Sequence, residues 1–419
     1  MAAQAETDVV ALELERVLPA LPTLFDREGP FFNAIEKRPV EIISNRQMRI
    51  PQEIRPGGKF GYFNPDGGDL GRGGSSVFDK AVISPAHIRY AVEYTTLTGW
   101  VTDSNKKAIV NNIQRTLSKS MAEMRRHCDG QAVGAGDGVI ATIESFTSGA
   151  GTTTAILDQS YGAKLLRFGQ DFSLYSSDLL TLRAGGEKTI TFHDLANRTV
   201  KFLDIAAEAI GDKLVASGLT ALPPVGIKGV LYHHSNSSVG FWLGYDRSTN
   251  PEIRANRVNA GGSAFSLPLA RLAINKAADR VGLDQVGNCQ AWMHPAQADS
   301  YEQLGQLVTM ITSSGEGKGL DRYFGGQMTM AGAPVKKSFN WHRKRIDFID
   351  MNYWGRGELH PISFYTPPGG NGQKVWEVRA SGGGIVTSNI FYIVASFDLF
   401  VTNPAGCSYI DTLAIPNGY

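Results

Sequence analysis

The sequence predicts an α+β fold in which many short strands accompany one dominant helix. Residues 103–128 contain neither glycine nor proline and repeat apolar side chains at helical spacing. Residues 139–225 instead contain a succession of short, strand-like segments separated by turn signals such as Gly185-Gly186. Glycine supplies 47 of 419 residues, above the ordinary share of about 7%, which indicates long loops and hairpins.

Length and composition limit the class of protein. A chain of 419 residues with 42% hydrophobic content can form two or three domains with a full core. The formal net charge is only +1, so any electrostatic partner must be met by a local patch. The first 22 residues carry several charges and lack the apolar core of a signal peptide. The apolar run 390–401 is too short to span a membrane, so we expect a soluble protein that is intracellular when synthesised.

Three cysteines, Cys128, Cys289 and Cys407, lie far apart in the sequence. An odd and sparse set argues against a disulfide framework and favours a reducing compartment. Cys289 has no base partner that the sequence identifies, and we interpret it as a buried core thiol.

Residues 1–44 are expected to form an N-terminal arm. The apolar side chains of residues 7–21 follow a loosely helical pattern that Pro19 and Pro22 stop. No strong period follows as far as Ser44. Such an arm has little core of its own and needs another surface on which to pack.

Residues 45–97 are predicted to form one long hairpin. The outgoing arm contains Pro51, which cannot donate to a ladder and indicates an edge or two-stranded arm. The tip, residues 57–76, contains eight glycines, and the return arm alternates well over residues 87–94. A two-stranded ribbon is poorly stable alone in water, and the sequence signals no partner for it within the chain.

The helix predicted at residues 103–128 can be capped by Asp103 or Ser104 and ended by Asp129-Gly130. At about 1.5 Å per residue it spans ~39 Å. Its two faces differ, because apolar side chains follow one stripe and basic side chains the other. The basic face is either an ordinary solvated surface or a surface that meets an anionic partner. Its residues are Lys107, Arg115, Lys119, Arg125 and Arg126.

The remaining chain mixes strands and helices. We expect a buried strand at residues 226–234, a helix at 267–281, a short strand at 289–293, a helix at 296–311, a glycine-rich loop at 315–326 and C-terminal strands within 346–419.

No catalytic or metal-binding motif is satisfied. The glycines at 315–319 surround Lys318, but a phosphate loop needs a Ser or Thr after the lysine and a longer spacing. His233 and His234 would point to opposite faces of a strand and could not bind one metal together. The loop from Asn64 resembles a calcium loop but has Ser75 where a glutamate is required. We therefore expect no cofactor and no enzyme, while an active site assembled from distant residues stays an open alternative.

The order of these parts resembles the Hong Kong 97-like fold of the major capsid proteins of tailed double-stranded DNA bacteriophages. In that family the parts are an N-arm, an extended hairpin called the E-loop, the spine helix of a peripheral (P) domain, and an axial (A) domain. Three local segments also look like one group of phage coat proteins: residues 62–73, 241–248 and 292–301.

This resemblance implies a domain order and a structural function. The expected divisions are an N-terminal arm (1–44), an E-loop hairpin (45–97), a P domain (98–225), an A domain (226–345) and C-terminal strands returning to the P domain (346–419). The strand-rich part of the P domain exceeds the minimal fold and is interpreted as an elaboration. The resemblance further implies self-assembly into hexamers and pentamers of an icosahedral head shell, which encloses phage DNA and is built in the host bacterial cytoplasm.

Partners and site residues follow from the same resemblance. The implied partners are further copies of the chain, a separate scaffolding protein, a portal, a decoration protein and non-specifically bound double-stranded DNA, with no membrane. The five basic helix residues would face the inside of the shell. Neither Lys59 nor Lys80 matches the cross-linking lysine of some relatives, so no covalent cross-links are expected. The alternatives are an encapsulin-type nanocompartment shell and an enzyme of unknown class. The E-loop residues that contact a neighbouring copy of the chain would be Tyr62, Phe63, Asp66, Gly67, Gly68, Asp69 and Arg72.

Overall fold

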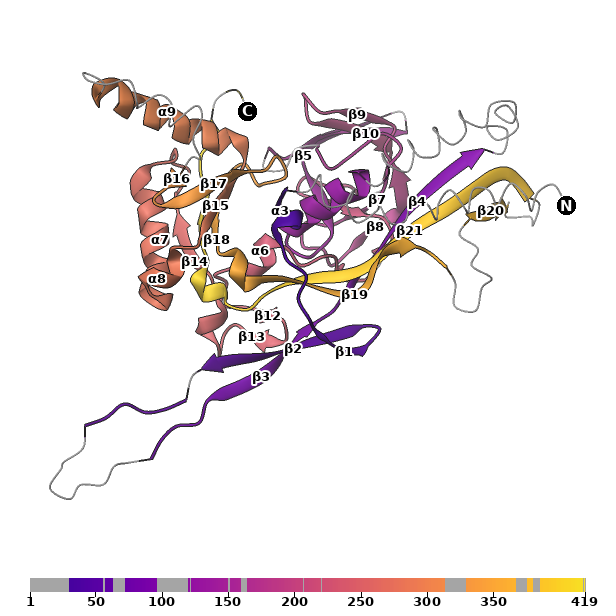
Figure 1. The fold of residues 1–419 in the computed structure, drawn as a ribbon. Coiled ribbons are helices and arrows are strands. Elements are labelled where there is room, and N and C mark those ends of the chain that lie inside the picture. Colours follow the sequence, from indigo (N-terminus) through magenta and orange to yellow (C-terminus); the bar gives the residue numbers. More distant parts are fainter. Residues whose placement is uncertain are drawn as a thin grey trace, which may run out of the picture.

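The computed structural model contains sheets of three, seven, two, six and four strands in the residues that it describes (Figure 1). Those residues are 30–55, 57–62, 72–95, 120, 122–149, 151–159, 164–205, 207–219, 221–312, 329–366, 375–379, 385–416 and 418.

The four-stranded sheet is organised around one long C-terminal strand, β21 (Ile385–Val401), which pairs with β19 (Trp354–Phe364), β20 (Val375–Arg379) and β4 (Ala86–Thr95). All three pairings are antiparallel. The β4 pairing runs in continuous register from Ala86 opposite Phe397 to Thr95 opposite Ser388. The C-terminal strand therefore fixes the chain that follows the hairpin.

The predicted single hairpin over residues 45–97 is wrong in its second half. The hairpin consists of β2 (Gln47–Arg55) and β3 (Val77–Ile83), and β1 (Glu41–Ser44) adds a third strand. The expected return arm is instead β4, which finds its partner in the C-terminal strand. Pro85 separates the two strands, and because proline has no backbone N–H the ladder ends there and the chain changes sheets.

The long helix continues further than its predicted end. Residues 122–133 are helical, so Asp129-Gly130 does not terminate the helix, and its predicted start lies outside the described residues. A Cβ on Gly130 would lie 2.5 Å from Cδ2 of Leu165. This glycine therefore permits close packing against Leu165 rather than a helix cap.

The side chain of Asp129 caps a different helix, α3 (Pro30–Ala34). Its Oδ1 accepts the backbone N–H groups of Phe31 at 3.1 Å and Phe32 at 3.0 Å. Both phenylalanines are fully buried. These two residues of the expected N-terminal arm pack against distant parts of the chain, Phe31 on Trp292 and Phe32 on Phe397.

Phe31 lies at the centre of the main core. Its ring meets those of Trp292, Trp341 and Trp354 edge-on, with centroids 5.2, 5.1 and 5.3 Å away. Edge-to-face geometry is favoured for aromatic pairs and adds about 0.5–1.5 kcal/mol to each pair's burial. The short helix α3 is therefore held by aromatic packing as well as by its cap.

The expected strand-rich segment at residues 139–225 is confirmed as a seven-stranded sheet with its own apolar core around Phe172 and Phe202. Its spatial order is β8 (Leu182–Thr189), β7 (Asp171–Tyr175), β11 (Lys213–Ala216), β5 (Val139–Gly149), β6 (Thr152–Leu157), β10 (Thr199–Leu203) and β9 (Phe192–Asp194).

A six-stranded mixed sheet with flanking helices forms the other side of the molecule (Figure 1). The predicted helices and strand are confirmed as α7 (Leu267–Val281), α9 (Pro295–Thr312) and β15 (Gln290–Met293). A short helix, α8 (Leu283–Val286), follows α7. The sheet order is β14 (Asn256–Asn259), β22 (Ser408–Asp411), β18 (Ile346–Ile349), β15, β17 (Ala333–Lys337) and β16 (Thr329–Met330).

The buried strand expected at residues 226–234 is wrong. The segment forms the one-turn helix α6 (Val230–His233). Gly229, which immediately precedes α6, packs against the long helix. A Cβ on Gly229 would lie 2.3 Å from the carbonyl oxygen of Ala132, so only glycine permits this approach. Short elements complete the chain: β12 (Phe241–Trp242), β13 (Tyr245–Asp246), η2 (Pro251–Ile253), η3 (Met351–Tyr353) and η4 (Pro404–Gly406). No helix in the described ranges is long and apolar enough to cross a membrane.

Candidate functional site

The hairpin of β2 and β3 projects away from the rest of the molecule (Figure 1). Its arms stay together beyond the strands, because Gly58 N–H donates to the carbonyl of Gly74 at 2.9 Å. A Cβ on Gly57 would lie 2.5 Å from the backbone nitrogen of Ser76. The glycines therefore allow two backbones to run in direct contact toward the tip.

Two aromatic side chains are exposed at this tip. Phe60 is 91% exposed and Tyr62 is 96% exposed, and their ring centroids lie 5.5 Å apart at 74°. Exposed aromatic groups on a projecting element, away from the chain's own core, are typical of a surface that meets a partner. Phe60 was not among the predicted site residues, although an aromatic residue between glycines was a usable signal.

The other predicted E-loop residues divide into two groups. Arg72 is exposed, as Tyr62 is. The rest of the predicted set lies outside the described residues: Phe63, Asp66, Gly67, Gly68 and Asp69.

The base of the hairpin is attached to the body. Val82 N–H donates to the carbonyl of Leu243 at 2.8 Å. The guanidinium of Arg55 lies 3.0 Å from Oε1 of Glu252, and both side chains are nearly half exposed. An exposed ion pair contributes only about 0–1 kcal/mol, so the backbone bond and the strand pairing carry most of this attachment. The strands at the base of the hairpin are thus attached to the body of the molecule.

The predicted basic face of the long helix is only partly described, and one of its members is placed wrongly. Arg125 is fully buried, where its charge lowers the pKa of Asp129 against the stronger opposite effect of burial. Arg126 is half-buried and donates a hydrogen bond to the carbonyl of Lys164. Three further predicted residues lie outside the described residues: Lys107, Arg115 and Lys119.

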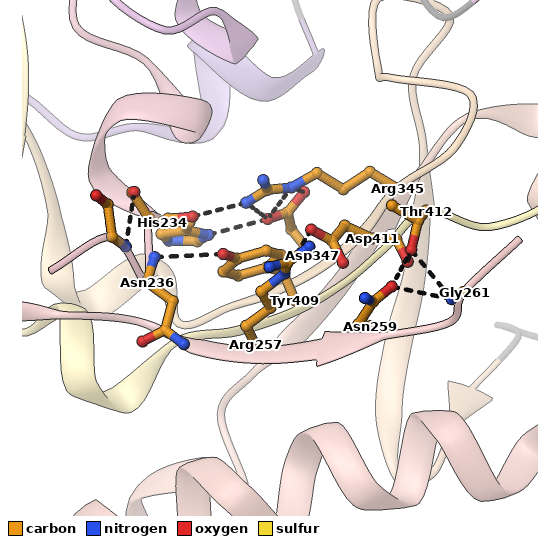
Figure 2. Close-up of polar contacts among 12 residues, drawn as sticks. His234, Asn236, Arg257, Asn259, Gly261, Arg345, Asp347, Tyr409, Asp411 and Thr412 are labelled. Carbon is orange, nitrogen blue, oxygen red and sulfur yellow. Dashed lines mark hydrogen bonds and ion pairs between the residues drawn. The ribbon is translucent and has the colours of Figure 1, made fainter. Parts of the chain in front are cut away.

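A buried polar network ties α6 to the six-stranded sheet (Figure 2). The guanidinium of Arg345 donates to both carboxylate oxygens of Asp347, at 2.7–3.0 Å, and to the carbonyl of His234 at 2.9 Å. It also lies 3.8 Å from the ring centroid of Tyr409. His234 Nδ1 is 3.2 Å from Asp347 Oδ1.

The buried groups of this network are paired with one another. Burial favours the neutral acid, yet Arg345 and the hydrogen bonds hold the pKa of Asp347 below its usual value. Burial lowers the pKa of His234, and Asp347 opposes that shift. His233 is also buried and accepts the indole N–H of Trp242 at 3.0 Å. The two histidines therefore have separate partners, and they lie at the end of α6 rather than on the strand from which their opposite orientation was predicted.

A cavity of about 1420 Å³ lies between the four-stranded sheet, the long helix and the seven-stranded sheet. His87 Nδ1 lies 2.8 Å from the hydroxyl of Ser396 on its wall. A serine and histidine can act as nucleophile and base when a third group orients the histidine. No hydrogen bond joins His87 to a carboxylate among the described residues, so they supply no third member of a triad for this pair.

No cluster of three or more metal-ligating side chains occurs among the described residues. The three cysteines are free and buried, and burial raises the pKa of both Cys128 and Cys289 to about 12. The projecting hairpin tip is therefore the best candidate for a functional surface.

Comparison with solved structures establishes the fold. The chain superposes on a chain of the cyanophage A-1(L) capsid asymmetric unit with a TM-score of 0.54, 11% identity and coverage of 92% of this chain and 93% of that chain. The predicted α+β, Hong Kong 97-like fold is thereby confirmed. Neither models of protein families nor curated protein sequences match the chain.

Two weaker likenesses have TM-scores under 0.5 and carry no argument. One is to the mature capsid of bacteriophage PhiM1, at 0.43 with 11% identity over 90% of this chain and 85% of that chain. The other is to the SrpI encapsulin complex from Synechococcus elongatus, at 0.41 with 9% identity over 93% and 89%.

Proposed function

We propose that this chain is the major capsid protein of a tailed double-stranded DNA bacteriophage and assembles into hexamers and pentamers of an icosahedral head shell. The observation that carries the proposal is the projecting hairpin, whose described tip exposes Phe60 and Tyr62 almost completely on a chain with this fold. In a shell, each hairpin would lie on a neighbouring copy of the chain and remove its aromatic side chains from water.

The geometry suits heterologous assembly. A projecting element that meets a different surface of the next copy gives head-to-tail contacts, which close into rings when the rotation permits. Burying two aromatic side chains removes about 150–250 Å² each from water. This is a useful part of the more than ~2,000 Å² that obligate interfaces bury.

The finer parts of the proposal concern domains, partners and location. We infer the arm, E-loop, P-domain and A-domain divisions given above, with the hairpin shortened to β2 and β3. The shell would form in the host bacterial cytoplasm on a separate scaffolding protein, incorporate a portal, bind a decoration protein and enclose DNA without base recognition. The absence of enzymatic activity and of covalent cross-links belongs to the same proposal.

An encapsulin-type nanocompartment shell is the second candidate, because the same fold and the same exposed hairpin would serve a shell that encloses cargo protein. The two differ in content. Particles with nuclease-protected DNA favour the phage capsid, and particles with enclosed protein and no DNA favour the nanocompartment.

The proposal is tested on the purified full-length chain by native mass spectrometry and negative-stain electron microscopy. We expect five- and six-membered rings or closed shells. A folded chain that stays monomeric at every concentration, alone and with its scaffolding protein, would contradict the proposal. Denaturing gels of the assembled particles then test cross-linking, for which we expect single-chain bands rather than a ladder.

A further inference from the structure

A group of basic side chains converges where three segments meet. Arg126 comes from the long helix, Lys164 from the segment before β7, and Arg343 from the segment between β17 and β18. We call these three residues the basic junction. All three are partly accessible to solvent, so the junction lies at the surface.

Backbone contacts fix two of these cations in place. Arg126 donates to the carbonyl of Lys164, and the ammonium of Lys164 donates to the carbonyls of Phe339 and Trp341, the latter at 3.2 Å. Carbonyl oxygens satisfy the donors but do not neutralise the charge. These contacts therefore hold the side chains of Arg126 and Lys164 in a fixed arrangement.

Arg343 has an unsatisfied donor. Its Nε–H is buried and has no hydrogen-bond partner in the described part of the chain. Its backbone carbonyl accepts Nε2 of Gln297 at 2.8 Å, so the main chain at this position is anchored independently of the guanidinium. A buried donor without a partner is unfavourable, so a movement of the Arg343 side chain that brings its guanidinium to an external acceptor would relieve it.

Two nearby carboxylates are paired with other arginines. Glu123 pairs with Arg167, and Glu144 pairs with Arg198 at 2.6 Å. No carboxylate forms an ion pair with Arg126, Lys164 or Arg343 within the described ranges.

The electrostatic effect on neighbouring groups has the sign of excess positive charge. Burial, together with the charges of Arg343 and Arg126, lowers the pKa of Lys164 to about 7. Burial also lowers the pKa of His294 to about 3, with Lys164 and Arg343 acting in the same direction. Burial lowers the pKa of His342 to about 4, with Arg345 and Lys164 acting in the same direction and Asp158 and Asp347 opposing it.

We propose that Arg126, Lys164 and Arg343 form a binding site for the phosphate group of an anionic ligand. A guanidinium can donate two parallel bonds to phosphate oxygens, while the ammonium acts as a compact charge. With the Arg343 side chain turned outward, a bound phosphate would accept its N–H groups and neutralise charge that no ion pair among the described residues balances. The site does not depend on the proposed shell function, although DNA would be one source of phosphate.

The test titrates the full-length chain with inorganic phosphate, with pyrophosphate and with a short double-stranded DNA oligonucleotide by calorimetry. We expect saturable binding of one phosphate-bearing ligand per chain. Arg343→Gln should weaken it at least about tenfold, which is about 1.4 kcal/mol, because it removes a charge-assisted hydrogen bond. Arg343→Lys, which keeps the charge, should lose less.

Arg271→Gln is the matched control, because Arg271 is an exposed arginine on α7. The affinity of Arg271→Gln for the phosphate-bearing ligand should equal that of the unmodified chain. Binding of a free anion assigns the site to free phosphates, and Arg343-dependent binding of the oligonucleotide alone assigns it to a phosphodiester backbone. No binding in any arm, or equal loss in Arg343→Gln and Arg271→Gln, overturns the proposal.

A second readout reports on the site directly. Trace acetylation of Lys164, followed by peptide mass spectrometry, measures how much of its amine is uncharged. A bound phosphate should raise the pKa of Lys164 and slow its acetylation in the unmodified chain but not in Arg343→Gln. An unchanged rate at saturating ligand would place the anion elsewhere and overturn the assignment.

Discussion

Lys228 contacts the carboxylate of Asp398 through both its backbone and its side chain. Its N–H donates to Oδ1 at 2.8 Å, and its ammonium lies 3.2 Å from Oδ2. Asp398 is fully buried in β21, and Lys228 lies in the segment that leaves the seven-stranded sheet. Burial raises the pKa of Asp398 to about 6, although Lys228 opposes the shift.

The first prediction concerns the pH dependence of stability. Between its unfolded pKa of 3.8 and its folded pKa of about 6, Asp398 binds more protons in the folded state. This contribution is therefore fully present below pH 3.8 and is lost as the pH rises through 6, by roughly 3 kcal/mol. Asp398→Asn cannot titrate, so relative to the unmodified chain it should gain about that amount between pH 4 and pH 7.

Urea unfolding at several pH values, followed by tryptophan fluorescence, measures this difference. Other titrating groups contribute equally to both proteins and cancel. A difference in the free energy of unfolding that stays constant from pH 4 to pH 7 would show that Asp398 does not titrate in this range.

The second prediction concerns the cap that Asp129 provides to α3. Asp129→Ala removes two charge-assisted bonds to backbone N–H groups and the 2.6 Å bond from Asn340 Nδ2. We expect a loss of about 3 kcal/mol in local stability. Hydrogen exchange at the amides of Phe31 and Phe32 should then be about 100-fold faster.

Asp194→Ala is the control, because Asp194 also accepts backbone N–H groups, those of Ala196 and Asn197, but in an exposed turn. It should accelerate exchange only in that turn. Unchanged protection of Phe31 and Phe32 in Asp129→Ala would mean that aromatic packing alone holds α3.

The sequence was informative for several elements whose signal was local. The alternation of residues 139–225 and the helical spacing of 267–281 depend on neighbours a few positions away, and both elements exist as predicted. The projecting hairpin tip was predicted for the same reason, because glycines and Pro51 act on their own backbone.

The features that were predicted wrongly, namely the partner of β4, the exposure of Arg125 and the helix end at Asp129-Gly130, depend on distant parts of the chain. The partner of β4 is β21, about 300 residues later, and no periodicity within either strand encodes that choice. Arg125 has the composition of an exposed helix face, yet the packing around Asp129 buries it. The Asp129-Gly130 pair has the local form of a helix end, but its carboxylate caps α3, almost 100 residues away.

The third prediction concerns the exposed aromatic tip. The double variant Phe60→Ser with Tyr62→Ser should leave the free energy of unfolding of the isolated chain nearly unchanged, because both side chains are over 90% exposed. If the tip lies on a neighbouring copy, the concentration needed for assembly should rise at least about tenfold, since buried aromatic anchors commonly contribute 2 kcal/mol or more. Light scattering during assembly measures this concentration.

Leu195→Ser provides the comparison, because Leu195 is 57% exposed in a turn far from the tip along the chain. Its assembly should match that of the unmodified chain. Equal assembly of the double variant would remove Phe60 and Tyr62 from the interface.

The fourth prediction concerns the buried thiols. Cys128, Cys289 and Cys407 are free and buried, and burial raises the pKa of the first two to about 12 and also raises that of Cys407. Because only the thiolate reacts, a thiol with a pKa of 12 is ionised at pH 8 in roughly one molecule in ten thousand. Iodoacetamide should therefore leave the native protein unlabelled and add three groups after unfolding in urea, as intact mass measures.

Leu195→Cys supplies a matched exposed thiol, which should be labelled within the native protein while the other three stay protected. Labelling of any native cysteine at the rate of the introduced one would mean that its surroundings open in solution, and would contradict the burial on which its raised pKa depends.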